Sequence, residues 1–121
     1  ERFMGKPEIY LYSSCTSCRK AEELLHEKGV EATRRDYFRN RFSRDELVDV
    51  LQRAHVTPFD VLSTRSRPYK ELDLANRTVT SDELVDLMVE HPQLLKRPLI
   101  IKNGRATVGF NRSAIEALIE E

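Results

Sequence analysis

An alternating pattern of apolar and polar residues, followed by a pattern with helical spacing, predicts the first strand and the first helix of the chain. Residues 8–13 (EIYLYS) alternate and are rich in Ile and Tyr, as in a short strand. From Thr16 onward apolar residues recur at helical spacing, and Gly29 stands where a C-terminal helix glycine belongs. Residues 30–38 (VEATRRDYF) predict a second, weaker strand. A strand, a helix and a strand in this order indicate a parallel βαβ unit.

Three capping boxes predict the starts of three further helices. In each box a Ser or Thr precedes a Glu by three residues, and apolar residues follow on one face. The pairs are Ser43 with Glu46, Thr80 with Glu83, and Ser113 with Glu116. The apolar residues expected to face the core behind these boxes are Leu47, Val48, Leu51, Ala54, Leu84, Leu87, Met88, Ile115, Leu118 and Ile119.

A hairpin is predicted over residues 97–110, because two apolar runs flank the dipeptide Asn103-Gly104. Asn-Gly between such runs is the strongest short-range hairpin signal. The less regular stretch before the third box predicts short helices around Pro58–Leu62 and Tyr69–Leu72.

The order of the elements predicts the fold class. It runs β-α-β, then a helical block at about 43–92, then a β-hairpin and a last helix. This is the order of a thioredoxin-like α/β fold with a helical insertion. We expect an N-terminal tail over residues 1–7 and a single domain over 8–121, a length that one hydrophobic core can support.

Composition excludes some classes of function. The net charge is zero, which gives no reason to expect direct binding to nucleic acid. No apolar run approaches the roughly 20 residues of a membrane helix, and the first residues (ERFMGK) lack the apolar segment of a secretory signal. The two cysteines therefore indicate a reducing, cytoplasmic compartment.

Those cysteines, Cys15 and Cys18, have C-x-x-C spacing. Cys15 is expected in the turn after the first strand, and Cys18 in the first turn of the helix. A helix N-terminus favours an anion, so the pKa of Cys15 should be lowered, and Arg19 and Lys20 add positive charge. An accessible thiolate with a second thiol within reach can attack a substrate and then be resolved into a disulfide.

Three other readings of the cysteine pair compete with redox chemistry. A structural disulfide would close only a very short loop and so stabilise little. A zinc site would need two more ligands, and the three histidines are scattered. Two buried thiols without a role remain an alternative. Pro98 supports the redox reading, because in thioredoxin-like folds a proline at the start of this strand is typically cis and packs beside the cysteine turn.

Four stretches in the same order, YSSCTSCRKAEELL, LSTRSRPYKEL, EHPQLLKRPLII and VGFN, resemble the arsenate reductase (ArsC)/Spx family. The resemblance extends from about Ile9 to Ile119. In the glutaredoxin-dependent arsenate reductases the first cysteine attacks arsenate, arginines hold the oxyanion, and glutathione completes the reduction. The resemblance therefore implies that Cys15 is the nucleophile and that Arg97 binds the oxyanion.

The other two family arginines do not align with arginines here. Their positions fall on Ser63 and Phe110, and Arg65 and Arg112 each lie two residues away. Arginine matters at such positions because its planar fork makes bidentate contacts to an oxyanion. The set that we predict for oxyanion binding is Arg97, Arg19 and Arg65.

The Spx-type regulators resemble the chain more closely around the cysteines, in CTSCRKA and STRS. In that branch the two cysteines form a redox-sensing disulfide and the protein binds the RNA polymerase α subunit. A glycine of the α-contacting loop falls on Thr57 here.

These observations lead to a hypothesis with one alternative. The hypothesis is a cytosolic thiol-disulfide redox protein, arsenate-reductase-like, that acts on a small oxyanion or a protein disulfide. It would use glutathione with glutaredoxin, or thioredoxin, as external reductant, and no bound cofactor or metal. The alternative is an Spx-type regulator that binds the RNA polymerase α subunit.

Overall fold

A four-stranded mixed sheet forms the centre of the molecule. The computed structural model describes residues 6–120, so residues 1–5 of the expected tail, and residue 121, lie outside the described part. The strands are β1 (Glu8–Leu11), β2 (Thr33–Asp36), β3 (Leu99–Lys102) and β4 (Arg105–Val108). They are ordered β2-β1-β3-β4; β1 and β2 are parallel, and the other two pairs are antiparallel. The parallel βαβ unit expected from the sequence is confirmed.

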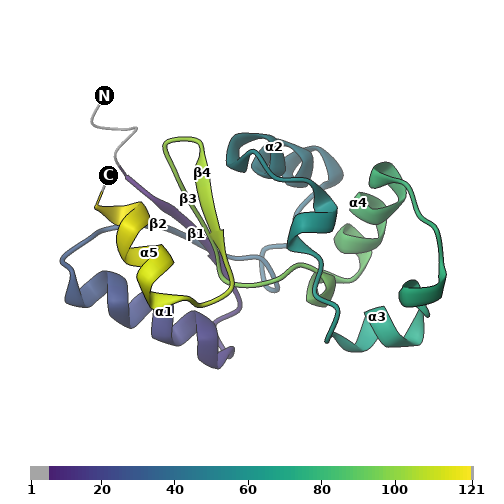
Figure 1. Cartoon of the computed structure of the whole chain (residues 1–121), viewed down its shortest axis with the longest axis horizontal. Helices are drawn as coiled ribbons and strands as arrows, with labels where there is room; N and C mark the ends of the chain where they lie inside the picture. Colours follow the sequence, from purple (N-terminus) through teal and green to yellow (C-terminus); the bar gives the residue numbers. More distant parts are fainter. Residues whose placement is uncertain (1–5, 121) are drawn as a thin grey trace.

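Helices cover both faces of this sheet. The helices α1 (Thr16–Glu27) and α5 (Arg112–Ile119) lie on one side, and the insertion between β2 and β3 lies on the other (Figure 1). Alternating strand residues separate the two cores: Ile9, Leu11 and Ile100 pack with α1 and α5, whereas Tyr10 and Leu99 pack with the insertion. Because the central strands β1 and β3 bury side chains on both faces, the two parts of the chain share one sheet.

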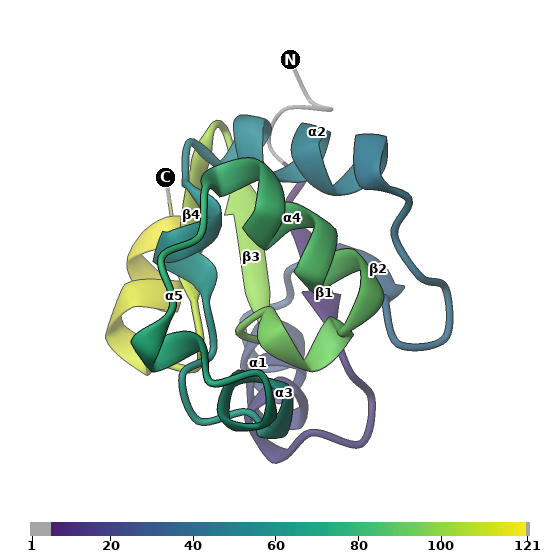
Figure 2. The same ribbon diagram turned by 90° about the vertical axis from the view of Figure 1, so that its right-hand side faces the viewer.

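The insertion is a compact set of short helices. It comprises α2 (Arg44–Ala54), η1 (Pro58–Val61), α3 (Arg67–Glu71), η2 (Leu74–Asn76), α4 (Ser81–Glu90) and η3 (Pro92–Leu94). Figure 2 faces it and shows α4 between α2 and α3. The boxes at Ser43 and Thr80 are both formed, with reciprocal hydrogen bonds to Glu46 and Glu83. The thioredoxin-like α/β fold with a helical insertion is thus confirmed.

The predicted core-facing sides of α2 and α4 are confirmed, with two additions. Val48 and Leu87 are half-buried and pack against the core, and Val50 and Val85, which were not predicted, are fully buried in it. The neighbouring elements thus cover a wider stripe of each helix than the predicted residues define.

The third predicted capping box, at Ser113 and Glu116, is wrong. The N-cap of α5 is Asn111, whose side-chain oxygen accepts a hydrogen bond of 3.0 Å from the Ala114 N–H. Ser113 therefore lies inside the first turn, and Glu116 instead forms ion pairs with Arg112 and Lys28. Asparagine is as good an N-cap as serine, so sequence spacing alone did not distinguish the two starts.

The predicted hairpin is confirmed at Asn103-Gly104. Both residues have left-handed backbones, with φ of 52° and 76°, as a tight two-residue turn between strands requires. The His55 ring nitrogen Nδ1 lies 2.5 Å from the Gly104 carbonyl oxygen, so the end of α2 contacts the tip of the hairpin.

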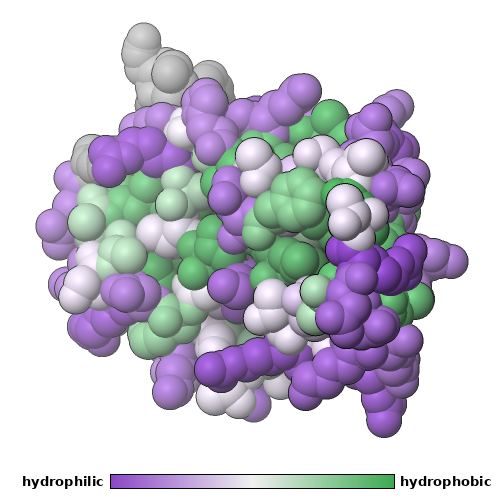
Figure 3. Space-filling model, turned by 45° about the vertical axis from the view of Figure 1, so that its right-hand side comes forward, coloured by the Kyte–Doolittle hydropathy of each residue, from purple (hydrophilic) through white to green (hydrophobic). Residues whose placement is uncertain are grey.

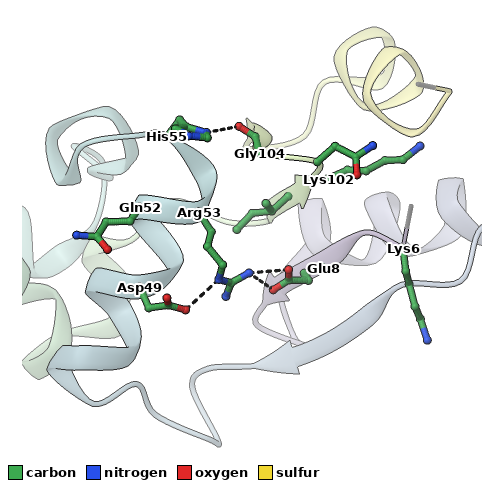
Figure 4. A pocket seen from close by; sticks show the side chains of 10 residues that line it. Lys6, Glu8, Asp49, Gln52, Arg53, His55, Lys102 and Gly104 are labelled. Carbon is green, nitrogen blue, oxygen red and sulfur yellow. Dashed lines mark hydrogen bonds and ion pairs between the residues drawn. The ribbon is translucent and has the colours of Figure 1, made fainter. Parts of the chain in front are cut away.

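A cavity of about 500 Å³ lies beside this contact, at the end of the sheet away from the cysteines (Figure 4). Its central charges are paired with each other: Arg53 Nη1 lies 2.7 and 2.6 Å from the Glu8 carboxylate oxygens, and Arg53 Nε donates to Asp49 at 2.9 Å. These bonds connect α2 to β1, so the cavity lies at the contact between the insertion and the sheet. Within residues 6–120, no helix is long and apolar enough to span a bilayer.

Candidate functional site

The two cysteines lie at the start of α1, shortly after the end of β1, but their surroundings differ. Cys15 is the N-cap residue of α1 and is partly exposed, whereas Cys18 lies in the first turn and is 0% exposed. The Cys15 N–H donates to the Tyr12 carbonyl at 2.9 Å, which closes a turn over Tyr12–Cys15. Both thiols are free. One thiol is thus available to a substrate, and the other lies behind it in the core.

A buried carboxylate holds this turn in place. Asp36, 9% exposed at the end of β2, accepts hydrogen bonds from the Ser13 hydroxyl and, at 3.1 Å, from the Ser13 N–H. It also accepts from the N–H groups of Phe38 and Arg39, at 3.0 and 3.3 Å. Burial acts to raise the pKa of Asp36, but these donors outweigh it, and the pKa lies below its usual value. The ionised carboxylate therefore connects the end of β2 to the cysteine turn.

The same surroundings separate the acidities of the two thiols. Partial burial acts to raise the pKa of Cys15, but the N–H and thiol of Cys18, the Ser17 N–H and the charge on Arg97 together lower it. These N–H groups belong to the first turn of α1, where the helix dipole also favours an anion. Burial raises the pKa of Cys18 to about 12, and the neighbouring Cys15 adds to the rise. Cys15 is therefore the better nucleophile near neutral pH.

Cys15 opens onto a cleft of about 580 Å³ between the cysteine turn and the insertion. The cleft is lined by Cys15, Ser17, Ser63, Thr64, Arg65, Lys96, Arg97, Gly109 and Phe110. Three of these side chains are cationic, and within the described part of the chain no carboxylate lines the cleft. An anion beside Cys15 would thus meet positive charge and hydroxyl donors together.

The structure brings most of the predicted site residues together. Arg65 and Arg97 both line the cleft with Cys15, and the Arg97–Pro98 peptide bond is cis, as expected for this proline. Arg19 does not line the cleft; its side chain is exposed on α1. Arg112 does not replace a cleft arginine, because its guanidinium is paired with Glu27 and Glu116, at 2.7 and 3.1 Å.

Several residues of the site were not predicted from the sequence. Lys96 stands next to Arg97 in the sequence and could have been considered for that reason alone. Asp36 had a subtler signal, since it ends a strand predicted to run parallel to the one before the cysteines. The hydroxyls of Ser17 and Thr64 had no signal that separates them from other surface residues.

A metal site has no support in the described part of the chain. No group of three or more His, Cys, Asp or Glu side chains among residues 6–120 is arranged to hold an ion. The described site offers two thiols beside a cationic cleft.

Comparison with known proteins gives consistent results. The model of the ArsC family matches residues 10–118. The chain is similar to the global transcriptional regulator Spx of Streptococcus pyogenes, with 35% identity over 92% of this chain and 83% of that protein. It is 36% identical to the regulatory protein MgsR of Bacillus subtilis, over 85% of this chain and 82% of that one. Among solved structures, the arsenate reductase from Vibrio cholerae superposes with a TM-score of 0.82 at 26% identity, covering 93% of this chain and 97% of that one.

The difference between the two thiols predicts selective alkylation. Near neutral pH, iodoacetamide should modify Cys15 and leave Cys18 unmodified, because Cys18 is buried and its pKa is about 12. Peptide mass mapping of the native protein measures both sites, and the same reaction in urea provides the control in which both react. Equal rates at the two residues in the native protein would contradict the assignment of the nucleophile.

The bonds of Asp36 predict an effect of pH on stability. The substitution Asp36→Asn should reduce the free energy of unfolding near neutral pH by about 1–3 kcal/mol. The N–H groups of Ser13 and Phe38 now donate to a charged carboxylate, and in the variant that charged acceptor is absent. The pKa of Asp36 is lowered by folding, so its contribution is complete above about pH 4 and is lost as the pH falls further. The deficit of Asp36→Asn in urea unfolding should therefore shrink in acid. Glu31→Gln, at an exposed position in the loop before β2, is the control and should change stability by no more than about 0.5 kcal/mol.

Proposed function

The chain belongs to the ArsC family, and from that membership we propose that it is a thiol redox protein in which Cys15 is the nucleophile and Cys18 the resolving thiol. One observation carries this assignment. The partly exposed Cys15, whose pKa is lowered, faces a cationic cleft, and the protonated Cys18 lies buried directly behind it. Two alternatives do not account for this arrangement. A single reactive cysteine would have no second thiol behind it, and two buried thiols without a role would not open onto a cleft.

The proposed reaction is a two-electron reduction of an acceptor. The Cys15 thiolate attacks an oxyanion such as arsenate, and one oxygen leaves as water after protonation. Cys18 then attacks the Cys15 sulfur, its proton passes to the departing arsenite, and the Cys15–Cys18 disulfide forms. As(V) gains the two electrons that the two thiols lose. An external dithiol, such as reduced thioredoxin, restores the pair by exchange; glutathione with glutaredoxin is the other candidate donor.

The cleft supports an oxyanion as the acceptor. Arg65, Lys96 and Arg97 supply positive charge around Cys15. Two positions at which the resemblance placed family arginines hold Ser63 and Phe110, and both line the same cleft. The cleft is therefore cationic but carries fewer arginines than that pattern, so we expect weaker binding of arsenate than a full set would give.

The first prediction of this proposal concerns arsenate turnover. The protein should release arsenite when supplied with thioredoxin and its reductase, and Cys15→Ser should abolish this activity. Cys18→Ser should lose the thioredoxin-driven activity, because the resolving thiol is absent. Arg97→Met should lower kcat/KM by about 10- to 100-fold, since a cationic oxyanion contact is removed.

Arg112→Met is the matched control, because Arg112 is paired with glutamates away from the cleft. It should retain wild-type turnover. Absence of arsenite with thioredoxin, and equally with glutathione and glutaredoxin, would contradict an arsenate-reducing role.

A regulatory role is the second candidate, favoured by an apolar groove on the insertion. The groove has a volume of about 370 Å³ and includes Phe59, which is 48% exposed, together with Leu62 and Tyr69. Figure 3, with the insertion side turned forward, shows apolar surface (green) among hydrophilic residues on this side. The position that the resemblance connects with polymerase contact is Thr57, which caps η1, and Phe59 lies two residues after it. In this candidate the groove binds a protein partner, the RNA polymerase α subunit, and the cysteine pair controls that binding.

The regulatory candidate predicts binding that depends on Phe59. The reduced and the oxidised protein should bind purified RNA polymerase α subunit with different affinities in fluorescence anisotropy. Phe59→Ser should weaken the tighter complex by about 10-fold or more, as loss of an exposed aromatic anchor does, whereas Phe59→Leu should weaken it less. The Cys15→Ser variant should bind with one affinity under both conditions. No measurable binding in either redox state would exclude this partner.

A further inference from the structure

Arg97 is held near Cys15 by unusual means. Its Nε is buried and has no hydrogen-bond partner among residues 6–120, although the guanidinium also interacts with the Tyr37 hydroxyl. The guanidinium carbon instead lies 5.1 Å from the centre of the Phe38 ring and 6.0 Å from the centre of the Tyr12 ring. The two rings are stacked on each other, with centres 4.1 Å apart and planes inclined by 19°. These three distances place the guanidinium at the side of the stacked pair, close to both rings.

The fold brings these three residues together from distant parts of the sequence. Tyr12 directly follows β1, and Phe38 lies two residues after β2. Because the two strands are parallel neighbours, with Leu11 opposite Asp36, the chain leaves both strands at the same edge of the sheet. Arg97 reaches this edge from the segment before β3. The stack thus forms beside the turn that carries Cys15.

An aromatic pair can orient a guanidinium better than water can. The charge distribution of an aromatic ring attracts an arginine whose guanidinium lies within about 6 Å of the ring centre, and two rings packed on each other give the guanidinium a rigid neighbour. The rings also exclude water from one side of Arg97, so its charge acts on neighbouring groups through a less polar medium. Those neighbours include Cys15, whose ionised form is favoured by Arg97.

We propose that the stacked rings of Tyr12 and Phe38 are positioning residues that hold the Arg97 guanidinium beside Cys15. This inference rests on the proposed function, in which Cys15 is the nucleophile. The rings do not touch the reacting sulfur in this assignment; they act through Arg97. The partly exposed Tyr12 and Phe38 therefore serve reactivity in addition to packing.

The acidity of Cys15 tests the proposal without any knowledge of the substrate. The apparent pKa of Cys15 is obtained from the pH dependence of its alkylation, with peptide mapping to separate it from Cys18. Arg97→Met should raise this pKa, and Tyr12→Leu and Phe38→Leu should raise it in the same direction. A rise of one pKa unit corresponds to about 10-fold slower alkylation below the pKa, and we expect the ring variants to slow it by about 3- to 10-fold.

Two further sets of variants distinguish positioning from a structural role. Tyr12→Phe and Phe38→Tyr keep the rings and should keep the wild-type pKa. In an Arg97→Met background, Tyr12→Leu and Phe38→Leu should have no additional effect, because the residue through which the rings act is already absent.

Phe42→Leu is the matched control for the loss of a ring. Phe42 packs with Tyr10 and Tyr37 and lies under Arg35, so its loss removes aromatic and cation–π contacts but leaves both rings beside Arg97 in place; it is joined to Phe38 only through Tyr37. It should lower the melting temperature and leave the pKa of Cys15 unchanged.

The possible outcomes separate this proposal from the proposed function. If Arg97→Met raises the pKa of Cys15 and the ring variants do not, the positioning role is overturned and the nucleophile stands. If the ring variants act equally with and without Arg97, their role is structural and the proposal is again overturned. If Cys15 in the wild type has the pKa of an ordinary thiol, the proposed function fails, and the positioning role fails with it.

Discussion

The parallel pairing of β1 with β2 is the constraint on which the rest of the site depends. Antiparallel neighbours would send the two chain ends to opposite edges of the sheet, whereas parallel strands deliver them to the same edge. Here Leu11 lies opposite Asp36, so the Asp36 carboxylate meets the N–H and hydroxyl of Ser13. The cysteine turn is consequently built against the end of β2, and its conformation is determined by a buried, ionised side chain.

The helical insertion supplies the other wall of the cleft. Backbone hydrogen bonds of 2.7 Å join Ser63 to Leu94 and Lys96 to Val61, so the segment before α3 is paired with the segment before Arg97. This pairing brings Arg65 across from the cysteine turn. The cleft therefore exists only when the insertion and the sheet are both folded, and its positive charge comes from both parts.

The two cysteines show how three residues of sequence separation can produce different chemistry. The first turn of α1 leaves Cys15 at the helix end, next to free N–H groups and Arg97, and turns Cys18 into the core between the sheet and α5. Partial exposure with favourable dipoles stabilises a thiolate, and full burial suppresses one. The structure therefore places one accessible thiol and one buried thiol side by side, within a fold that is similar both to an arsenate reductase and to transcriptional regulators.

The sequence by itself determined the elements, because their signals act over a few residues. The capping boxes at Ser43 and Thr80, the dipeptide Asn103-Gly104 and the C-x-x-C turn before a helix all specify local backbone geometry. Tertiary structure decided which groups meet. Arg65 lines the cleft and Arg112 does not, although each lies two residues from a family position, because Arg112 has glutamate partners on α1 and α5. The stacking of Tyr12 on Phe38 and the partners of Asp36 likewise follow from strand pairing across more than twenty residues, a relation that no local pattern encodes.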